Sequence, residues 1–195
     1  MNLSEFHSYI ADNQSNICQL TVIQNSRTVI NDTWNGYKAD DTVNVVGYEK
    51  GVGAAGYGLC LSAEEMAKIG FFCLKKGVFH NKRIVSEKWL EESTKVRLCC
   101  GEKFRNMAYG YLWWIIDENE GSYAAIGNSG NVIYVNADKD LVISIAATFK
   151  PAIFDRIEFI KGYIEPFAAK QHFRRSSRSA LAVRPGLSAI FTQNF

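Results

Sequence analysis

The chain has 195 residues, and its 22 Lys+Arg against 20 Asp+Glu give a formal net charge of +2. The 47% hydrophobic and 22% charged residues are typical of a soluble globular protein and exclude wholesale disorder. No apolar run approaches the ~20 residues that span a bilayer, and the first residues, MNLSEFHSYIADNQ, do not form a secretory signal. Five cysteines without CxxC spacing and three scattered histidines favour reduced thiols and no metal site. We therefore expect a cytoplasmic protein without a metal or another cofactor.

The first third of the chain predicts a helix followed by a hairpin. In residues 3–12, four apolar side chains recur at helical spacing. Residues 17–24 and 28–34 are rich in β-branched residues and flank a short polar turn, Asn25-Ser26-Arg27, which is typical of a β-hairpin.

The middle of the chain predicts two helices. Ser62 followed three residues later by Glu65 is a capping box, and the helix that it opens ends at Gly77. We expect Met66, Ile69 and Cys73 to share the apolar face of this helix, with Gly70 and Leu74 beside them. Ser86 is expected to cap a second, shorter helix.

The last part predicts an antiparallel meander and a closing helix. Aromatic and β-branched runs at 108–117, 122–127, 131–136 and 141–149 alternate with turn residues. Residues 153–167 place four isoleucines on one apolar stripe: Ile153, Ile157, Ile160 and Ile164. The order of elements indicates an α+β fold with one antiparallel sheet. We expect residues 17–34 to pair with the strands of 108–149, and helices 3–12 and 153–167 to lie on the same face.

Residues 168–195 differ in composition from residues 1–167. No acidic residue follows Glu165, whereas one lysine and four arginines do, and the segment lacks regular periodicity. We predict a domain at 1–167 and a basic, disordered tail at 168–195. The alternative is a basic arm that binds nucleic acid or a membrane surface. Four arginines are weak evidence for such an arm when the rest of the protein is not basic, so we expect neither a nucleic-acid nor a membrane partner.

A glycine-rich segment, Gly51-Val52-Gly53-Ala54-Ala55-Gly56, has the spacing of a dinucleotide-binding motif. In that motif the last glycine opens a helix whose N-terminus meets the pyrophosphate. Here the helix begins only at Ser62, so we interpret the spacing as chance.

Residues 56–94 carry a more specific signal. They read GYGLCLSAEEMAKIGFFCLKKGVFHNKRIVSEKWLEEST. This stretch resembles the serine hydrolases related to class C β-lactamases and penicillin-binding proteins, and the resemblance extends over about residues 1–167. The matching positions are Leu61, Ser62, Ala63, Glu65, Met66, Ala67, Lys68, Ile69, Gly70, Gly77, Ile84, Ser86 and Trp89.

The resemblance implies a catalytic serine in an S-x-x-K motif directly after VNV (43–45). Lys50 stands in the register of the lysine, but Gly47 occupies the place of the serine, and S-x-x-K occurs nowhere in the chain. The family's Y-x-N motif should lie in a helical region that is missing between VNV and the glycine-rich turn. Tyr134-Val135-Asn136 has the same letters, but in a late strand, and we interpret it as coincidence.

The third motif implied by the resemblance is K-T-G or H-x-G on the strand that lines the cleft. The corresponding residues are Asn128, Ser129 and Gly130, which we take as candidate substrate-binding residues. Asn128 replaces the basic residue of the family. A tight turn between two strands explains the same letters equally well.

Together these observations predict a β-lactamase/transpeptidase-like antiparallel sheet with terminal helices on one face and most of the all-helical domain missing. By resemblance the chain is a β-lactamase-related serine hydrolase that opens lactam, ester or peptide bonds through an acyl-enzyme. Because the S-x-x-K serine and the Y-x-N motif are absent, we expect it to be inactive. The alternative is a non-catalytic remnant or binding module, and a small molecule or peptide is the expected ligand of the cleft.

Overall fold

An antiparallel sheet of eight strands forms the centre of the molecule, in the order β2-β1-β10-β9-β8-β7-β6-β5. The computed structural model describes residues 1–42, 60–127, 130–148 and 155–171. The strands of this sheet are β1 (Ile17–Gln24), β2 (Arg27–Thr33), β5 (Leu98–Cys99), β6 (Ala108–Tyr109), β7 (Trp114–Asp117), β8 (Ser122–Ile126), β9 (Val132–Asn136) and β10 (Leu141–Ala147). The helices are α1 (Leu3–Asn13), α2 (Ala63–Leu74), α3 (Glu87–Ser93) and α4 (Arg156–Phe159), and β3 (Val78–Phe79) and β4 (Lys82–Arg83) form a separate ribbon.

The first strand of the chain pairs with the last one, as the second and third strands of the sheet. Strand β1 pairs with β10 from Ile17 opposite Ala147 to Gln24 opposite Leu141. Asn25 and Ser26 join β1 to β2, both with positive φ (49° and 60°), as two-residue hairpin turns require. The predicted hairpin and its pairing with the later strands are therefore confirmed.

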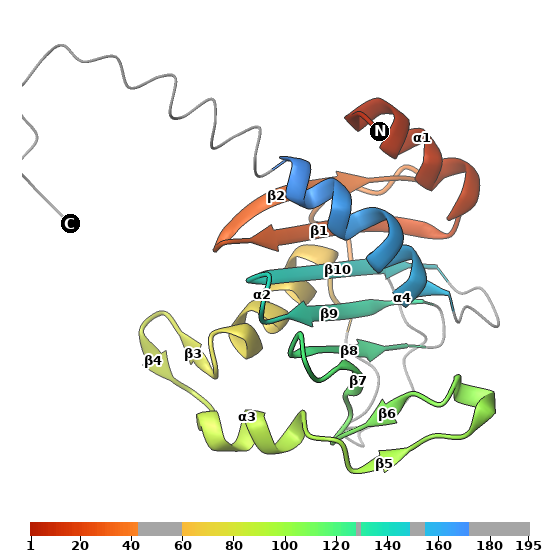
Figure 1. Cartoon of the computed structure of the whole chain (residues 1–195). Helices are drawn as coiled ribbons and strands as arrows, with labels where there is room; N and C mark the ends of the chain where they lie inside the picture. The colour runs from red at the N-terminus through yellow and green to blue at the C-terminus, as the bar shows by residue number, and fades with distance from the viewer. Residues whose placement is uncertain (43–59, 128–129, 149–154, 172–195) are drawn as a thin grey trace, which may run out of the picture.

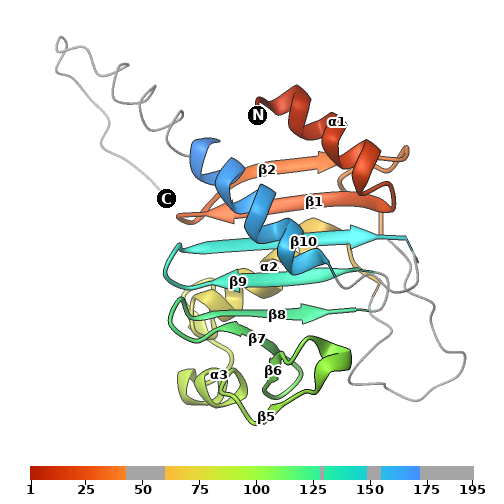
Figure 2. The same ribbon diagram turned by 45° about the vertical axis from the view of Figure 1, so that its right-hand side comes forward.

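Helices α1 and α4 lie on one face of the sheet and α2 on the other (Figures 1 and 2). Because side chains alternate along a strand, Ile143 and Ile145 of β10 face the α1 and α4 side, whereas Val142 faces α2. On the first face the rings of Phe6 and Phe167 stack with centroids 4.1 Å apart. The expectation that the two terminal helices share a face is confirmed.

Helix α2 approaches the sheet through small residues. Its buried residues are Ala63, Ala67, Gly70 and Cys73, whereas Met66 and Ile69 are only partly buried. A Cβ added at Gly70 would lie 2.6 Å from Val142 Cγ1. The predicted apolar face is therefore confirmed at Gly70 and Cys73, and Met66 and Leu74 pack against the core as partly buried residues. The closest approach to the sheet is made by small residues, because larger side chains would not fit there.

The ends of α2 follow the sequence prediction. Ser62 Oγ accepts the amide of Glu65 (3.3 Å), and Glu65 Oε2 accepts the amide of Ser62 (2.8 Å). After the helix, Gly77 adopts φ +81°, and a Cβ there would lie 2.2 Å from the carbonyl oxygen of Val85. The capping box and the glycine stop are both confirmed, as is the Ser86 cap of α3.

The C-terminal helix differs from the prediction in its interior. After α4 comes a π-helical segment, Ile160–Ile164, and residues 165–171 continue as helix. Of the predicted stripe, Ile160 and Ile164 are buried and Ile157 is partly buried against the same core, whereas Ile153 lies outside the described residues. The π-turn shifts the register of the following residues, and Phe159, Phe167 and Ala168 complete the buried face. Helix and core therefore extend past residue 167, where we placed the domain boundary.

Two expectations concern features of the whole chain. Among the helices of the described ranges, none combines the length and apolarity that crossing a bilayer needs. Within the same ranges, no group of three or more His, Cys, Asp or Glu side chains is arranged to hold a metal ion. Residues 172–195, most of the predicted tail, lie outside the described part of the chain.

Candidate functional site

The candidate site predicted from the sequence is only partly described by the structure. Gly47, Lys50, Asn128 and Ser129 lie outside the described residues. Gly130 is described and lies between β8 and β9 with φ +77°, a backbone conformation that favours glycine. Its amide donates to the carbonyl of Gly127 at 3.0 Å. The described atoms at this position thus form a tight connection between two neighbouring strands.

A buried arginine lies directly against this connection. Arg156 Nε donates to the carbonyl oxygen of Gly130 (3.2 Å), Nη2 donates to Asn16 Oδ1 (2.8 Å) and Nη1 donates to Gln14 Oε1. Arg156 is 1% exposed, and this burial lowers the pKa of its guanidinium to about 10. The arginine therefore ties the β8–β9 connection to the segment between α1 and β1.

The sequence carried no signal for this role of Arg156. It stands in IFDRIEFIK, where a cation next to apolar helix positions is usually solvated. Its three acceptors are a carbonyl oxygen and two side-chain amide oxygens, so three of its five N–H groups are bound by neutral groups. A positive charge is thus buried beside Gly130.

Tyr134 lies in the middle of β9, and Asn136 lies at the end of the strand that is remote from Gly130. At 3.3–3.4 Å per strand residue, Tyr134 is roughly 13 Å along the strand from Gly130. Both side chains are completely buried on or next to the face covered by the C-terminal helix. Tyr134 Oη donates to Glu165 Oε1 at 2.6 Å, and Asn136 Nδ2 donates to Glu120 Oε2 at 3.1 Å.

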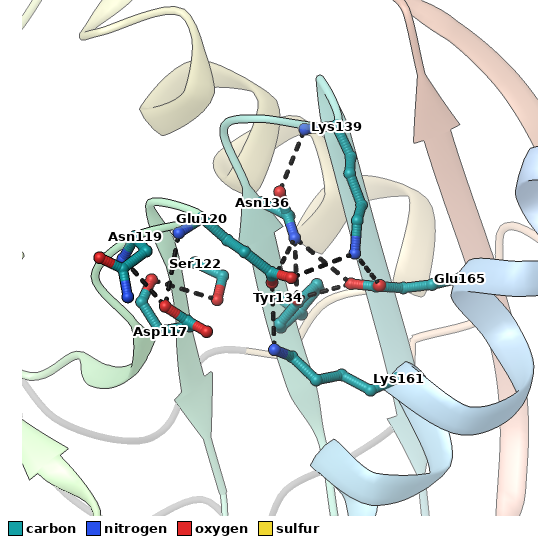
Figure 3. A network of polar contacts seen from close by, with 9 residues as sticks. All are labelled: Asp117, Asn119, Glu120, Ser122, Tyr134, Asn136, Lys139, Lys161 and Glu165. Carbon is teal, nitrogen blue, oxygen red and sulfur yellow. Dashed lines mark hydrogen bonds and ion pairs between the residues drawn. The ribbon is translucent and has the colours of Figure 1, made fainter.

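Around these two residues the structure builds a closed polar network, shown in Figure 3. Lys139 Nζ contacts Glu165 Oε2 at 2.5 Å, and Lys161 Nζ contacts Glu120 Oε2 at 3.0 Å. The hydrogen bond from Lys161 lowers the pKa of Glu120, and the hydrogen bond to Glu165 raises the pKa of Lys139. Burial, followed by the contact with Glu165, raises the pKa of Tyr134.

The contacts of this network hold several elements of the fold together. It joins the β7–β8 turn, strand β9, the β9–β10 turn and the C-terminal helix. Tyr134 retains its proton, and its hydroxyl is engaged with a carboxylate. The described contacts therefore hold Tyr134 and Asn136 in a structural network, and the interpretation of Y-x-N as a coincidence of letters stays a prediction.

Ser62 lies in the stretch of residues 56–94 that resembles the family, and it is therefore a candidate for a nucleophilic serine. Its hydroxyl lies 3.1 Å from Glu65 Oε2 and accepts the Glu65 amide. Ser62 is buried at the start of α2, and its neighbour Ala63 is held by Gln19 Oε1 at 2.8 Å. This geometry is that of a helix cap.

A cavity of about 300 Å³ lies away from Gly130. It is bordered by the end of α2, by α3, and by the turn from β7 to β8. Gly121, Tyr123 and Ala137 contribute to its lining, so it lies at the end of the sheet opposite to Gly130. Sequence reasoning did not find it, because its walls come from four separate segments.

Comparison with known proteins gives one curated relative and a weak structural likeness. No family model matches the chain. Over 117 residues the chain is 26% identical to a 6-aminohexanoate-dimer hydrolase of Paenarthrobacter ureafaciens, which covers 56% of this chain and 30% of that protein. A solved structure named as a putative 6-aminohexanoate-dimer hydrolase of Bacillus anthracis is 24% identical, with a TM-score of 0.49, over 60% of this chain and 30% of that chain.

The chain thus spans about a third of the length of the curated relative that it matches. That relative is a hydrolase of the β-lactamase/transpeptidase fold. Over the 117 matched residues, the chain is related to the β-lactamase-related serine hydrolases, the family that its sequence motifs indicate.

Proposed function

We propose that this chain carries the sheet region of a β-lactamase-related serine hydrolase and does not itself catalyse acyl transfer. One observation carries the second half of the proposal: Gly47 stands where the family has its nucleophilic serine, three residues before Lys50. Acyl transfer by this route needs a hydroxyl beside a base and an oxyanion site within reach. A glycine side chain supplies no hydroxyl.

The finer fold belongs to the same proposal. The five strands from β2 to β8 with α1 and α4 on one face correspond to the sheet half of a β-lactamase/transpeptidase-like domain. We propose that most of the all-helical half has no counterpart in this chain, since the segment between VNV (43–45) and Ser62 is too short for it. Asn128, Ser129 and Gly130 then retain at most a role in binding a small molecule or peptide.

The proposal is tested by incubating the purified chain with nitrocefin, p-nitrophenyl acetate, a fluorescent penicillin and the 6-aminohexanoate dimer named in its relative. We expect no turnover and no covalent label, because loss of the nucleophile in such a unit costs on the order of 10⁶ in rate. A Lys50→Ala variant prepared in parallel controls for contaminating hydrolases. Turnover that this substitution abolishes, or stoichiometric labelling of one serine, would overturn the proposal.

A second candidate function, a binding module without turnover, is favoured by the cavity beside α2 and α3. Its lining residues are all described, and it lies at the end of the sheet opposite to Gly130. Binding there would be independent of any acyl-transfer chemistry.

A further inference from the structure

The cavity beside α2 and α3 has the size of a small-molecule site. Its volume of about 300 Å³ lies at the lower end of the range for ligand pockets, which are concave, mostly apolar and carry a few polar groups. A ligand with about ten non-hydrogen atoms suits this volume.

The floor of the cavity is apolar. It includes Cys73 from α2, Leu90 from α3, Ile115 from β7 and Tyr123 from β8. Cys73 is 8% exposed, and burial raises the pKa of its thiol to about 11, so the thiol is neutral at physiological pH. In the described ranges this thiol makes no hydrogen bond, although it lines the cavity. The floor therefore favours an apolar group over water.

The rim of the cavity carries excess negative charge. Four carboxylates and two lysines contribute to the lining, which leaves a net charge of −2. Both lysines are already paired: Lys76 Nζ lies 2.5 Å from Glu87 Oε1, and Lys95 Nζ lies 3.1 Å from Glu92 Oε2. Within the described part of the chain, Glu91 and Glu118 have no ion-pair partner inside 4 Å. Asp117 accepts the amide of Asn119 at 2.9 Å and stays without a cation in the same ranges.

We propose that this cavity binds a small organic ammonium ion whose apolar body lies on the floor and whose charged group faces the acidic rim. Burying the apolar body supplies most of the affinity, and the carboxylates select the sign of the charge. The ring of Tyr123 adds an aromatic surface, which also favours cations. The proposal goes beyond the proposed function and stands or falls separately from it.

The probe is 2-phenylethylammonium, compared with the neutral 2-phenylethanol and the anionic 3-phenylpropionate. We expect the ammonium ion to bind with a Kd on the order of 1 mM, which is appropriate for so few atoms. The neutral analogue should bind several-fold more weakly and the anion not measurably. Titration followed by amide chemical shifts maps the site, and raising the ionic strength should weaken only the binding of the cation.

Two variants separate the floor from the rim. Ala137 is exposed and lines the cavity, so Ala137→Trp should fill it and weaken binding at least tenfold without disturbing the fold. Glu118→Gln should weaken binding of the ammonium ion several-fold and leave that of 2-phenylethanol unchanged. Glu102→Gln removes an exposed carboxylate elsewhere and is the matched control.

Circular dichroism and the unfolding midpoint verify that each variant is folded. Equal binding of the three probes would overturn the proposal. So would full binding by a folded Ala137→Trp variant, shifts that map outside the cavity, or no binding of the ammonium ion at about 10 mM, roughly ten times the expected Kd.

Discussion

Tyr134 and Glu165 are 31 residues apart in the sequence, yet the Tyr134 hydroxyl donates a 2.6 Å hydrogen bond to the Glu165 carboxylate. Tyr134 is in the centre of the sheet, and Glu165 follows the π-helical segment of the C-terminal helix. Glu165 is 8% exposed and also contacts Lys139 at 2.5 Å. The hydrogen bond from Tyr134 therefore anchors the last helix to the strand beneath it, and the ion pair with Lys139 neutralises the nearly buried carboxylate.

This contact predicts a measurable cost for removing one hydroxyl. Tyr134→Phe keeps the ring in the core but removes the hydroxyl that donates the 2.6 Å hydrogen bond to Glu165. We expect the free energy of unfolding to fall by about 1–2 kcal/mol. Tyr111→Phe is the control, since Tyr111 is 47% exposed and its ring contacts Trp89 and Arg97 without needing the hydroxyl. Urea unfolding measures both, and equal stability of the two variants would contradict the anchoring role.

The charges of the same network predict how stability depends on pH. The pKa of Glu120 is lowered in the folded state, so its contribution is present above its unfolded value of about 4.3 and is lost as the pH falls through the folded value. The pKa of Lys139 is raised, so its contribution is present below about 10.4 and is lost as the pH rises through the folded value.

We therefore expect a plateau in the free energy of unfolding that declines at both acidic and alkaline pH. Glu120→Gln should flatten the acidic decline, and Lys139→Met should flatten the alkaline one. Urea titrations at a series of pH values check this. If each variant shows the same pH profile as the parent chain, these two groups do not cause the dependence.

The close approach of α2 to the sheet predicts an unusual response to alanine. Gly70→Ala gains helix propensity, but its Cβ would lie 2.6 Å from Val142 Cγ1 and 2.9 Å from Ile133 Cγ2. Both neighbours are β-branched and stiff, so we expect a net loss of about 1–3 kcal/mol.

Gly162→Ala is the matched control for this substitution. Gly162 lies in the C-terminal helix, and a Cβ added there would have no heavy atom within 4 Å, so alanine should be neutral or stabilising by up to about 1 kcal/mol. Thermal or urea unfolding compares the two variants. A Gly70→Ala variant as stable as Gly162→Ala would mean that the helix can move away from the sheet freely.

The hydrogen bond from Arg156 to Gly130 predicts that the β8–β9 connection depends on the Arg156 side chain. Arg156→Met retains much of the volume but leaves the carbonyl of Gly130 and the side-chain oxygens of Gln14 and Asn16 without their shared donor. We expect a loss of about 2–4 kcal/mol and faster amide exchange at Gly127 and Gly130. Arg83→Met, at an exposed position on β4, provides the comparison. Unchanged exchange at the connection would show that Arg156 does not hold it.

Several features were predictable because short segments of the sequence determine them. The Ser62–Glu65 capping box, the Asn25-Ser26 turn and the alternation in the late strands each depend on residues within a few positions of one another. The family resemblance likewise rests on the contiguous stretch from residue 56 to 94. Local hydrogen bonding and backbone preference are sufficient to predict such elements.

Tertiary packing alone decided the rest. The apolar residues of α2 would allow more than one side of the helix to face the sheet. The side with Ala67 and Gly70 packs there, because the helix lies too close to Val142 and Ile133 for larger side chains. Two of the three partners of Arg156 are 140 and 142 positions away in the sequence. Tyr134 and Glu165 become neighbours only when the last helix covers β9. Buried polar groups must find partners wherever the fold brings donors and acceptors together, so these contacts follow from the packed structure rather than from any local pattern.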